Sequence, residues 1–309
     1  MENTKIATRA KKKKISGNKK AGKRKMVRAF WLFIAPSGIL FAIFFMIPLI
    51  LNIFLSFTNY DGWKTMDYIG IENYVETLSD NRFWTSMYKT FIYAIVNIPF
   101  KVMIPLLLAI LLTSERVKLK TIARTAIYIP VLLSSLVVGI TINWMFSQEY
   151  GLINFIIQQF GGNSIAWGSH STLATFIISV ASTWASTGFY MIIYIGAINN
   201  INQDMYEAAD MDGANSFQRF IKITFPMLAP TTFLVTLLST INLLKEYALI
   251  QGITQGGPGT STTFIIQYIF DKGFNQSEYG YAAAISVIIM VIFAFIAFIQ
   301  FKVNDGGEV

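Results

Sequence analysis

Five polar or aromatic residues that could contact a solute lie inside two long apolar segments. They are Trp184, Tyr190, Asn242, Lys245 and Glu246. A charged side chain within a membrane span normally faces protein or water, so it is a candidate functional residue. Aromatic faces and hydrogen-bonding groups together suit a sugar, and we predict that these five residues line a solute path.

Two alternatives remain open for these residues. The polar side chains of 172–198 would also serve to pack helices together in a membrane. The free-energy cost of placing the charged side chains of Lys245 and Glu246 in the membrane would be smaller if they lay near its outer interface. Because adjacent residues point about 100° apart on a helix, we expect these two charges to meet water or different helices.

Residues for catalysis or metal binding are scarce. The 309 residues include no cysteine and one histidine, His170, which we predict to lie in a loop. The sequence has no GxxxxGK[ST] phosphate-binding loop and no HExxH pair. We therefore predict a non-catalytic protein that holds no metal and no cofactor of its own.

The composition is typical of a membrane protein. Hydrophobic residues make up 54% of the chain, more than in an ordinary soluble domain. Six apolar segments are long enough to cross a hydrocarbon layer of about 30 Å as helices. We predict an all-α polytopic membrane protein with one transmembrane domain at 30–302. Its six spans are expected at about 30–57, 88–113, 125–146, 172–198, 227–251 and 279–301.

The distribution of positive charge predicts the orientation of these spans. Segment 1–29 carries a dense block of Lys and Arg that cannot form a core, and we predict a disordered cytoplasmic tail. The alternative is that this tail binds RNA or anionic lipid. For the protein as a whole we expect contact with membrane lipid and no nucleic-acid partner. Segment 114–124 is also basic, whereas the outer loops have few positive charges. Both termini, including the tail 303–309, are therefore predicted to be cytoplasmic.

The polar stretch at 202–226 is predicted to form an elbow of two helices. Asn202 is a suitable N-cap for a helix over Gln203–Met211, and Asp212-Gly213 would end that helix because Gly tolerates positive φ. A second helix is expected from about Asn215. Its inner stripe is predicted to contain Phe217, Phe220, Ile221 and Thr224. An ordinary surface loop between two spans is the alternative.

The same stretch resembles the EAA signature of permease subunits of binding-protein-dependent ABC importers. The match consists of Glu207-Ala208-Ala209, Gly213, Ile223 and Pro226, with Phe225 where that signature usually has Leu. The segments IGIENYVETLSDNRFW (69–84), ITQGGPGTST (253–262) and YGYAAAIS (279–286) resemble the sugar-importer branch, typified by maltose and glycerol-phosphate permeases. Together the matches span most of the chain after about residue 30.

The resemblance implies a type I ABC importer permease fold in a bacterial cytoplasmic membrane. The elbow would dock on a cytoplasmic ATPase through Glu207, Ala208, Ala209, Asp212, Gly213, Arg219, Lys222, Ile223 and Pro226. Arg219 and Lys222 would meet acidic ATPase surface.

The implied partners are a second, different permease chain, two copies of the ATPase, which bind ATP and Mg, and an external sugar-binding protein. The alternatives are an ABC importer permease for an amino acid, phosphate or peptide, and a secondary transporter.

Overall fold

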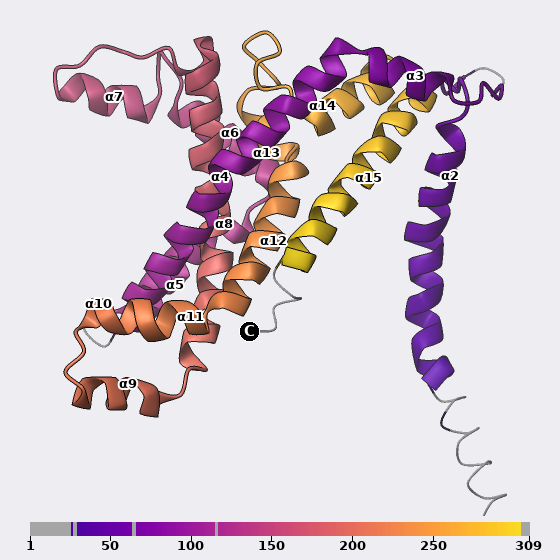
Figure 1. Ribbon diagram of the computed structural model, residues 1–309. Helices are drawn as coiled ribbons and strands as arrows, with labels where there is room; N and C mark the ends of the chain where they lie inside the picture. Colours follow the sequence, from indigo (N-terminus) through magenta and orange to yellow (C-terminus); the bar gives the residue numbers. More distant parts are fainter. Residues whose placement is uncertain (1–25, 27–29, 64–65, 115–116, 304–309) are drawn as a thin grey trace, which may run out of the picture.

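The computed structural model describes Met26 and residues 30–63, 66–114 and 117–303 (Figure 1). These residues are mostly helical, and their β pairing is limited to an isolated antiparallel bridge between Thr58 and Tyr68. The predicted N-terminal tail lies outside the described residues except for Met26. The predicted C-terminal tail lies outside them except for Val303.

Within the described part of the chain, four helices are long and apolar enough to cross a membrane. They are Phe30–Leu55, which ends in α2 (Ile47–Leu55), α4 (Asn81–Thr113), α8 (Ser171–Asn199) and α15 (Tyr279–Val303). Two bent helix pairs pass the same test when each pair is taken together, which brings the possible spans to six. α4 begins earlier than the predicted second span and includes Phe83 and Trp84, which join it to the outer loop.

The third predicted span, 125–146, is not one continuous helix. It consists of α5 (Lys120–Tyr128), a short 3-10 turn (Ile129–Leu132) and α6 (Ser135–Met145), with a bend of 103°. Pro130 has no N–H to continue the helical ladder, and Leu133 is extended, with ψ 146°. The backbone therefore changes direction within the apolar segment.

The segment 216–253 is also broken. It begins with α10 (Ser216–Arg219), a π turn (Phe220–Thr224) and α11 (Phe225–Met227), and it bends by 66° before α12 (Ala229–Leu244). The helix predicted over 227–251 is interrupted near its C-terminal end, because α12 ends at Leu244. Lys245 is its C-cap and Tyr247 has φ −135° and ψ −61°, after which α13 (Ala248–Ile253) begins.

A close backbone crossing holds α13 against α6. A Cβ on Gly139 would lie 2.9 Å from the Cα of Gly252, and a Cβ on Gly252 would lie 2.8 Å from the Cα of Gly139. Small residues of this kind allow helices in membrane proteins to approach closely. The break after α12 is therefore fixed by packing and not by local sequence alone.

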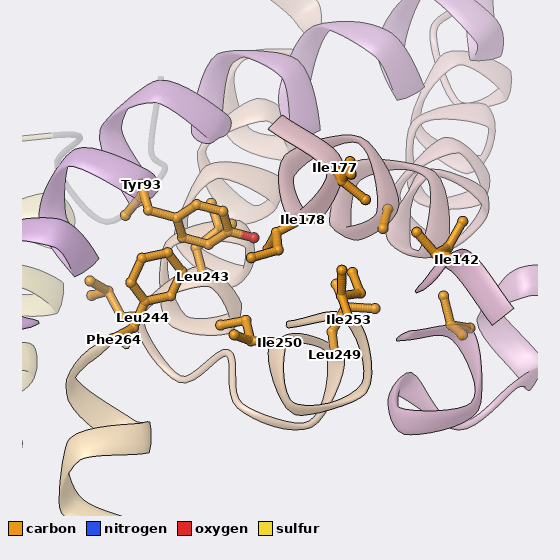
Figure 2. Packing of buried hydrophobic residues seen from close by; sticks show 13 residues of the cluster. Tyr93, Ile142, Ile177, Ile178, Leu243, Leu244, Leu249, Ile250, Ile253 and Phe264 are labelled. Atoms are coloured by element: carbon orange, nitrogen blue, oxygen red, sulfur yellow. The ribbon is translucent and has the colours of Figure 1, made fainter. Parts of the chain in front are cut away.

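The main buried cluster joins the breaks to the long helices (Figure 2). Tyr93 of α4 stacks on Phe264, with ring centroids 4.7 Å apart. Leu243 from the end of α12 and Ile250 from α13 lie in the same cluster, as does Ile178 of α8. The core thus sits where α4, α8, α12 and α13 meet.

Short helices cover the end of the molecule opposite the elbow. They are α3 (Glu72–Ser79), α7 (Leu152–Gln159) and α14 (Ile265–Phe270), which a π turn over Asp271–Asn275 extends (Figure 1). These stretches lie between the predicted spans, where outer loops are expected. Helix Phe30–Leu55 stands apart from the other spans in Figure 1, and its most apolar window has no buried residue. The chain just after it contacts α15 through a hydrogen bond from the Gly280 N–H to the Tyr60 carbonyl, 3.0 Å.

Asp80 connects three elements at this end. Its Oδ1 accepts from the Arg82 N–H at 2.7 Å and so caps α4, while its Oδ2 accepts from the hydroxyls of Tyr268 of α14 and Tyr281 of α15. Burial by itself would raise the pKa of Asp80, but these hydrogen bonds to the carboxylate outweigh it and lower the pKa below its ordinary value of 3.8.

We expect replacement of Asp80 by Asn to weaken this connection and to remove an acid-sensitive part of the stability. Because the folded-state pKa is lowered, the Asp80 contribution is fully present above pH 3.8 and is lost as the pH falls through the lowered pKa. Thermal unfolding of the purified chain between about pH 3 and 6 would measure this. An Asp80→Asn variant with the same acid-side decline as the wild type would contradict the assignment.

Candidate functional site

A cavity of about 470 Å³ lies beside the break that follows α12. α4, the 3-10 turn, α6, α8 and α13 supply its other walls. Four of the five predicted path residues line it, namely Tyr190, Asn242, Lys245 and Glu246. The tertiary fold thus brings together residues that lie more than 50 positions apart, and we call this space the inner cavity.

Two hydrogen bonds fix three of the predicted residues in the wall, namely Tyr190, Asn242 and Glu246. The Asn242 Nδ2 donates to the Tyr190 hydroxyl at 2.8 Å, and Tyr190 is 0% exposed. The Ser182 hydroxyl donates to Glu246 Oε2 at 2.7 Å. Both bonds join α8 to the end of α12. They position the Asn242 amide and the Glu246 carboxylate at the cavity wall, where each can exchange hydrogen bonds with a polar solute.

Charge in the cavity comes from three residues. Lys101 of α4 is 2% exposed and lines the same space as Lys245 and Glu246, and Glu246 acts electrostatically on it. A buried ammonium needs a compensating charge or polar partners. Lys245 and Glu246 follow the last turn of α12, so the expectation that they are adjacent helical residues is wrong. They reach the cavity because the helix has ended.

Most residues of this wall were not among the predicted path residues, and Lys101, Ser182 and Tyr247 are polar or aromatic examples. Lys101 is a charged residue within an apolar run, and this signal could have placed it among the path residues. Ser182 is one of many hydroxyl residues in 172–198, and Tyr247 is one of many aromatic residues. Only the fold distinguishes these two from their neighbours.

Trp184 is the predicted residue that the inner cavity does not include. It is 48% exposed and lines a separate groove of about 1350 Å³ between α4 and α8, together with Phe100, Phe176 and Val180. On α8, Trp184 lies on a different face from Ser182 and Tyr190. Polarity and depth in the sequence placed it near the path, but the helical face was decided by packing.

The elbow has the local structure that its sequence predicts. α9 (Gln203–Met211) begins at Asn202, whose side chain accepts from the Asp204 N–H at 3.1 Å. Gly213 has φ +73° after the helix ends. Asn215 then caps α10, and its side chain and that of Gln218 bond reciprocally to each other's backbone N–H groups. Figure 1 shows α9 and α10 together at the end of the molecule opposite α7 and α14.

Two contacts connect the arms of the elbow. Arg219 Nη1 forms an ion pair with Asp210 Oδ1 at 2.6 Å, and the hydroxyls of Tyr206 and Thr224 are 2.9 Å apart. The predicted inner stripe is wrong at Phe217, which is 71% exposed, and at Ile221, which is also exposed; Thr224 is buried as predicted. Met211 is 88% exposed at the end of α9. The elbow therefore presents apolar side chains to its surroundings.

The other predicted coupling residues are mostly accessible. Glu207, Ala208, Asp212, Gly213, Lys222 and Pro226 are exposed, whereas Ala209, Arg219 and Ile223 are half-buried. Within the elbow the Arg219 guanidinium pairs with Asp210, and its contact with acidic ATPase surface stays a prediction. Among the described residues, no group of three or more His, Cys, Asp or Glu side chains could hold a metal ion.

Comparison with known proteins gives a consistent result. Residues 74–305 match the family "binding-protein-dependent transport system inner membrane component". The chain is 33% identical to the lactose transport system permease protein of Rhizobium radiobacter, over 88% of this chain and 92% of that protein. It is 30% identical to an arabinooligosaccharides transport system permease protein of Bacillus subtilis, over 89% and 88%.

Solved structures show the same fold. A chain of a bacterial ABC transporter involved in the import of the acidic polysaccharide alginate superimposes with a TM-score of 0.79 at 24% identity, over 91% of this chain and 97% of that chain. The family match, the relatives and the candidate membrane spans all indicate the same kind of protein. This chain belongs to the family of binding-protein-dependent transport system inner membrane components.

Proposed function

We propose that this chain is the permease subunit of an ATP-driven carbohydrate importer and forms part of the solute path by alternating access. The observation that carries the proposal is the inner cavity, where Tyr190, Asn242 and Glu246 converge beside a helix break. Broken helices that line a polar space are the usual form of a solute site within a membrane. The names of the related permeases, which include lactose, arabinooligosaccharide and trehalose/maltose systems, support a sugar as the solute.

The charges in the inner cavity bear on the class of sugar. Two ammonium groups, Lys101 and Lys245, face one carboxylate, Glu246. The hydroxyl and amide groups suit the hydroxyls of a neutral saccharide. The excess of positive charge would also allow an anionic or phosphorylated sugar, since a second negative charge would balance it.

The elbow is the proposed contact with a separate ATPase, which would bind ATP and Mg. Its exposed Met211 and Phe217 are apolar groups of the kind that enter a cleft on a partner. Arg219 and Lys222 are the two basic residues that were predicted to meet acidic ATPase surface. Arg219 forms an ion pair with Asp210, so Lys222 is the more exposed of the two cations. Movement of the ATPases would reach the inner cavity through the bend between the elbow and α12. The proposed contact with the ATPase goes together with the prediction that the elbow and both termini are cytoplasmic.

A second, different permease chain is the proposed occupant of the surfaces that this chain leaves open. Helix Phe30–Leu55 has an unburied apolar window, and the large groove beside Trp184 is mostly apolar. An external sugar-binding protein would deliver the solute at the end that carries α7 and α14. The related alginate transporter has been solved in complex with an alginate pentasaccharide-bound periplasmic protein, which supports this arrangement.

The test is sugar uptake by cells that lack this chain but keep the rest of the importer. Radiolabelled lactose, maltotriose and arabinotriose are supplied separately, and the wild-type chain is expected to restore uptake of at least one of them. Asn242→Leu should lower that uptake at least about tenfold, because it removes a cavity amide and leaves the buried Tyr190 hydroxyl unpaired, at a cost of about 1–3 kcal/mol.

The matched control is Trp184→Phe, which changes the other groove and keeps an aromatic side chain there. It should leave uptake close to the wild-type value. Immunoblots of the membrane fraction confirm equal amounts of each variant. Wild-type uptake by Asn242→Leu would contradict the role of the inner cavity, and failure of the wild-type chain to restore any saccharide uptake would contradict the proposed substrate class.

A further inference from the structure

A second enclosed space lies nearer the end of the molecule that carries α7 and α14. It has a volume of about 570 Å³ and lies between the start of α4, α13, the loop that follows α13, and α14 with its π extension. This volume is within the range of about 300–1,000 Å³ that is usual for small-molecule sites. We call it the outer cavity. Apart from Tyr247, its lining residues differ from those of the inner cavity.

The frame of the outer cavity is held by hydrogen bonds. Lys89 Nζ donates to the Thr260 carbonyl at 2.6 Å and ties the loop to α4. The buried Gln267 accepts from the Phe264 N–H at 3.2 Å, and Asn275 Nδ2 donates to Asp271 Oδ1 at 2.9 Å. The hydrogen-bonding capacity of these polar groups is therefore used at least in part by contacts within the protein. They position the loop and α14 and are not the groups that would hold a ligand.

Three other polar side chains of the wall make no hydrogen bond within the described part of the chain. They are the side chains of Arg82, Gln251 and Gln255, all of which line the outer cavity. Each amide offers an acceptor and two donor hydrogens, and the guanidinium offers up to five donors. Three side chains from α4, α13 and the loop thus converge on one space with free hydrogen-bonding capacity of both kinds.

Aromatic rings form another part of the same wall. Tyr247 and Phe270 both line the outer cavity, and their ring centroids are 5.0 Å apart at an interplanar angle of 36°. Apolar ring faces beside amide and guanidinium groups match a saccharide, whose rings have C–H faces and hydroxyl edges. Tyr247 also lines the inner cavity. The two spaces are therefore separated in part by a single side chain.

We propose that the outer cavity is a saccharide-binding site in its own right, distinct from the inner cavity. Arg82, Gln251 and Gln255 would hold the hydroxyls of one or more sugar units, with an apolar sugar face against Tyr247 and Phe270. A saccharide would occupy it before reaching the inner cavity on the other side of Tyr247. The inference rests on the proposed transport of carbohydrate and adds a site that a single inner cavity does not require.

The absence of cysteine from the sequence allows a direct test on the full chain in its assembled importer. Single cysteines are placed in the outer cavity by Gln251→Cys and, separately, Gln255→Cys. Asn163→Cys, in the exposed loop after α7 at the same end, is the control. Each variant is labelled with a membrane-impermeant maleimide in the presence and absence of lactose, maltotriose or arabinotriose.

A saccharide that the importer takes up should slow labelling at residue 251 or 255 by about tenfold when its concentration is ten times its Kd. Labelling at residue 163 should not change. Addition of Asn242→Leu should leave this protection in place, because the outer site is separate from the inner one. Two cysteine positions are used so that one poorly folded variant does not decide the result.

The inference is overturned if a saccharide that is taken up protects neither outer position. Protection that disappears with Asn242→Leu also overturns it, since occupancy of the inner cavity would then be the cause. Absence of chain-dependent uptake for all three saccharides is a different result, which contradicts the proposed function and this site with it.

Discussion

Replacement of Gly213 by proline is expected to lower sugar uptake by at least about 100-fold while the ATPase activity of the complex continues. Gly213 has φ +73°, whereas proline fixes φ near −65°. Its N–H also donates to the Asp210 carbonyl at 3.1 Å, and proline removes that donor. The two arms of the elbow would lose their relative orientation, at a cost of about 3 kcal/mol or more. ATP hydrolysis and uptake, measured on the same vesicles, provide the two readouts.

Gly161→Pro is a closely matched control for this prediction. Gly161 also follows a short helix, has φ +81° and donates its N–H to a carbonyl, that of Gln158, at 3.0 Å. A Cβ at either glycine would meet no atom within 4 Å. Gly161 lies at the opposite end of the molecule, so its replacement should leave coupling intact. Normal uptake by Gly213→Pro, or equal loss in both variants, would rule out a specific coupling role for the elbow.

Replacement of Glu246 by leucine is expected to destabilise the chain by about 3 kcal/mol, the usual order for removing the partner of a buried charge. Glu246 is the carboxylate that lines the inner cavity with Lys101, and it accepts a hydrogen bond from Ser182. Its loss would leave the Lys101 ammonium uncompensated in a nearly closed environment. The apparent unfolding temperature of the purified chain, and the amount recovered from membranes, measure the effect.

The double variant Lys101→Met/Glu246→Leu separates charge from shape. If the uncompensated ammonium causes the loss, removal of Lys101 as well should restore most of the stability. Glu246→Gln keeps a group that can accept from Ser182 and removes only the charge. Lys245→Met changes the adjacent, exposed cation and should cost less than about 1 kcal/mol. A double variant no more stable than Glu246→Leu alone would show that the two charges do not interact.

The outline of the spans and the design of the elbow could be predicted from the sequence because both depend on local properties. An uninterrupted apolar run has few folded alternatives to a helix in a membrane, so the helices at 30–55, 171–199 and 279–303 follow closely from composition. The elbow depends on neighbours in the sequence: Asn202 caps the helix that follows it, and Gly213 takes a φ that other residues avoid. The charge of Lys101 within an apolar segment was likewise visible.

The inner cavity itself was decided by tertiary structure. An apolar helix has little periodicity, so hydropathy does not say that Ser182 and Tyr190 face inward while Trp184 lines another groove. The end of α12 at Leu244 follows from the fit of α13 against α6 through Gly139 and Gly252, residues far apart in the sequence. That break places Lys245 and Glu246 at the cavity that Lys101 also lines. The sequence by itself determined which groups were available, and long-range packing determined which of them share a cavity, because the face that a membrane helix buries depends on its neighbours.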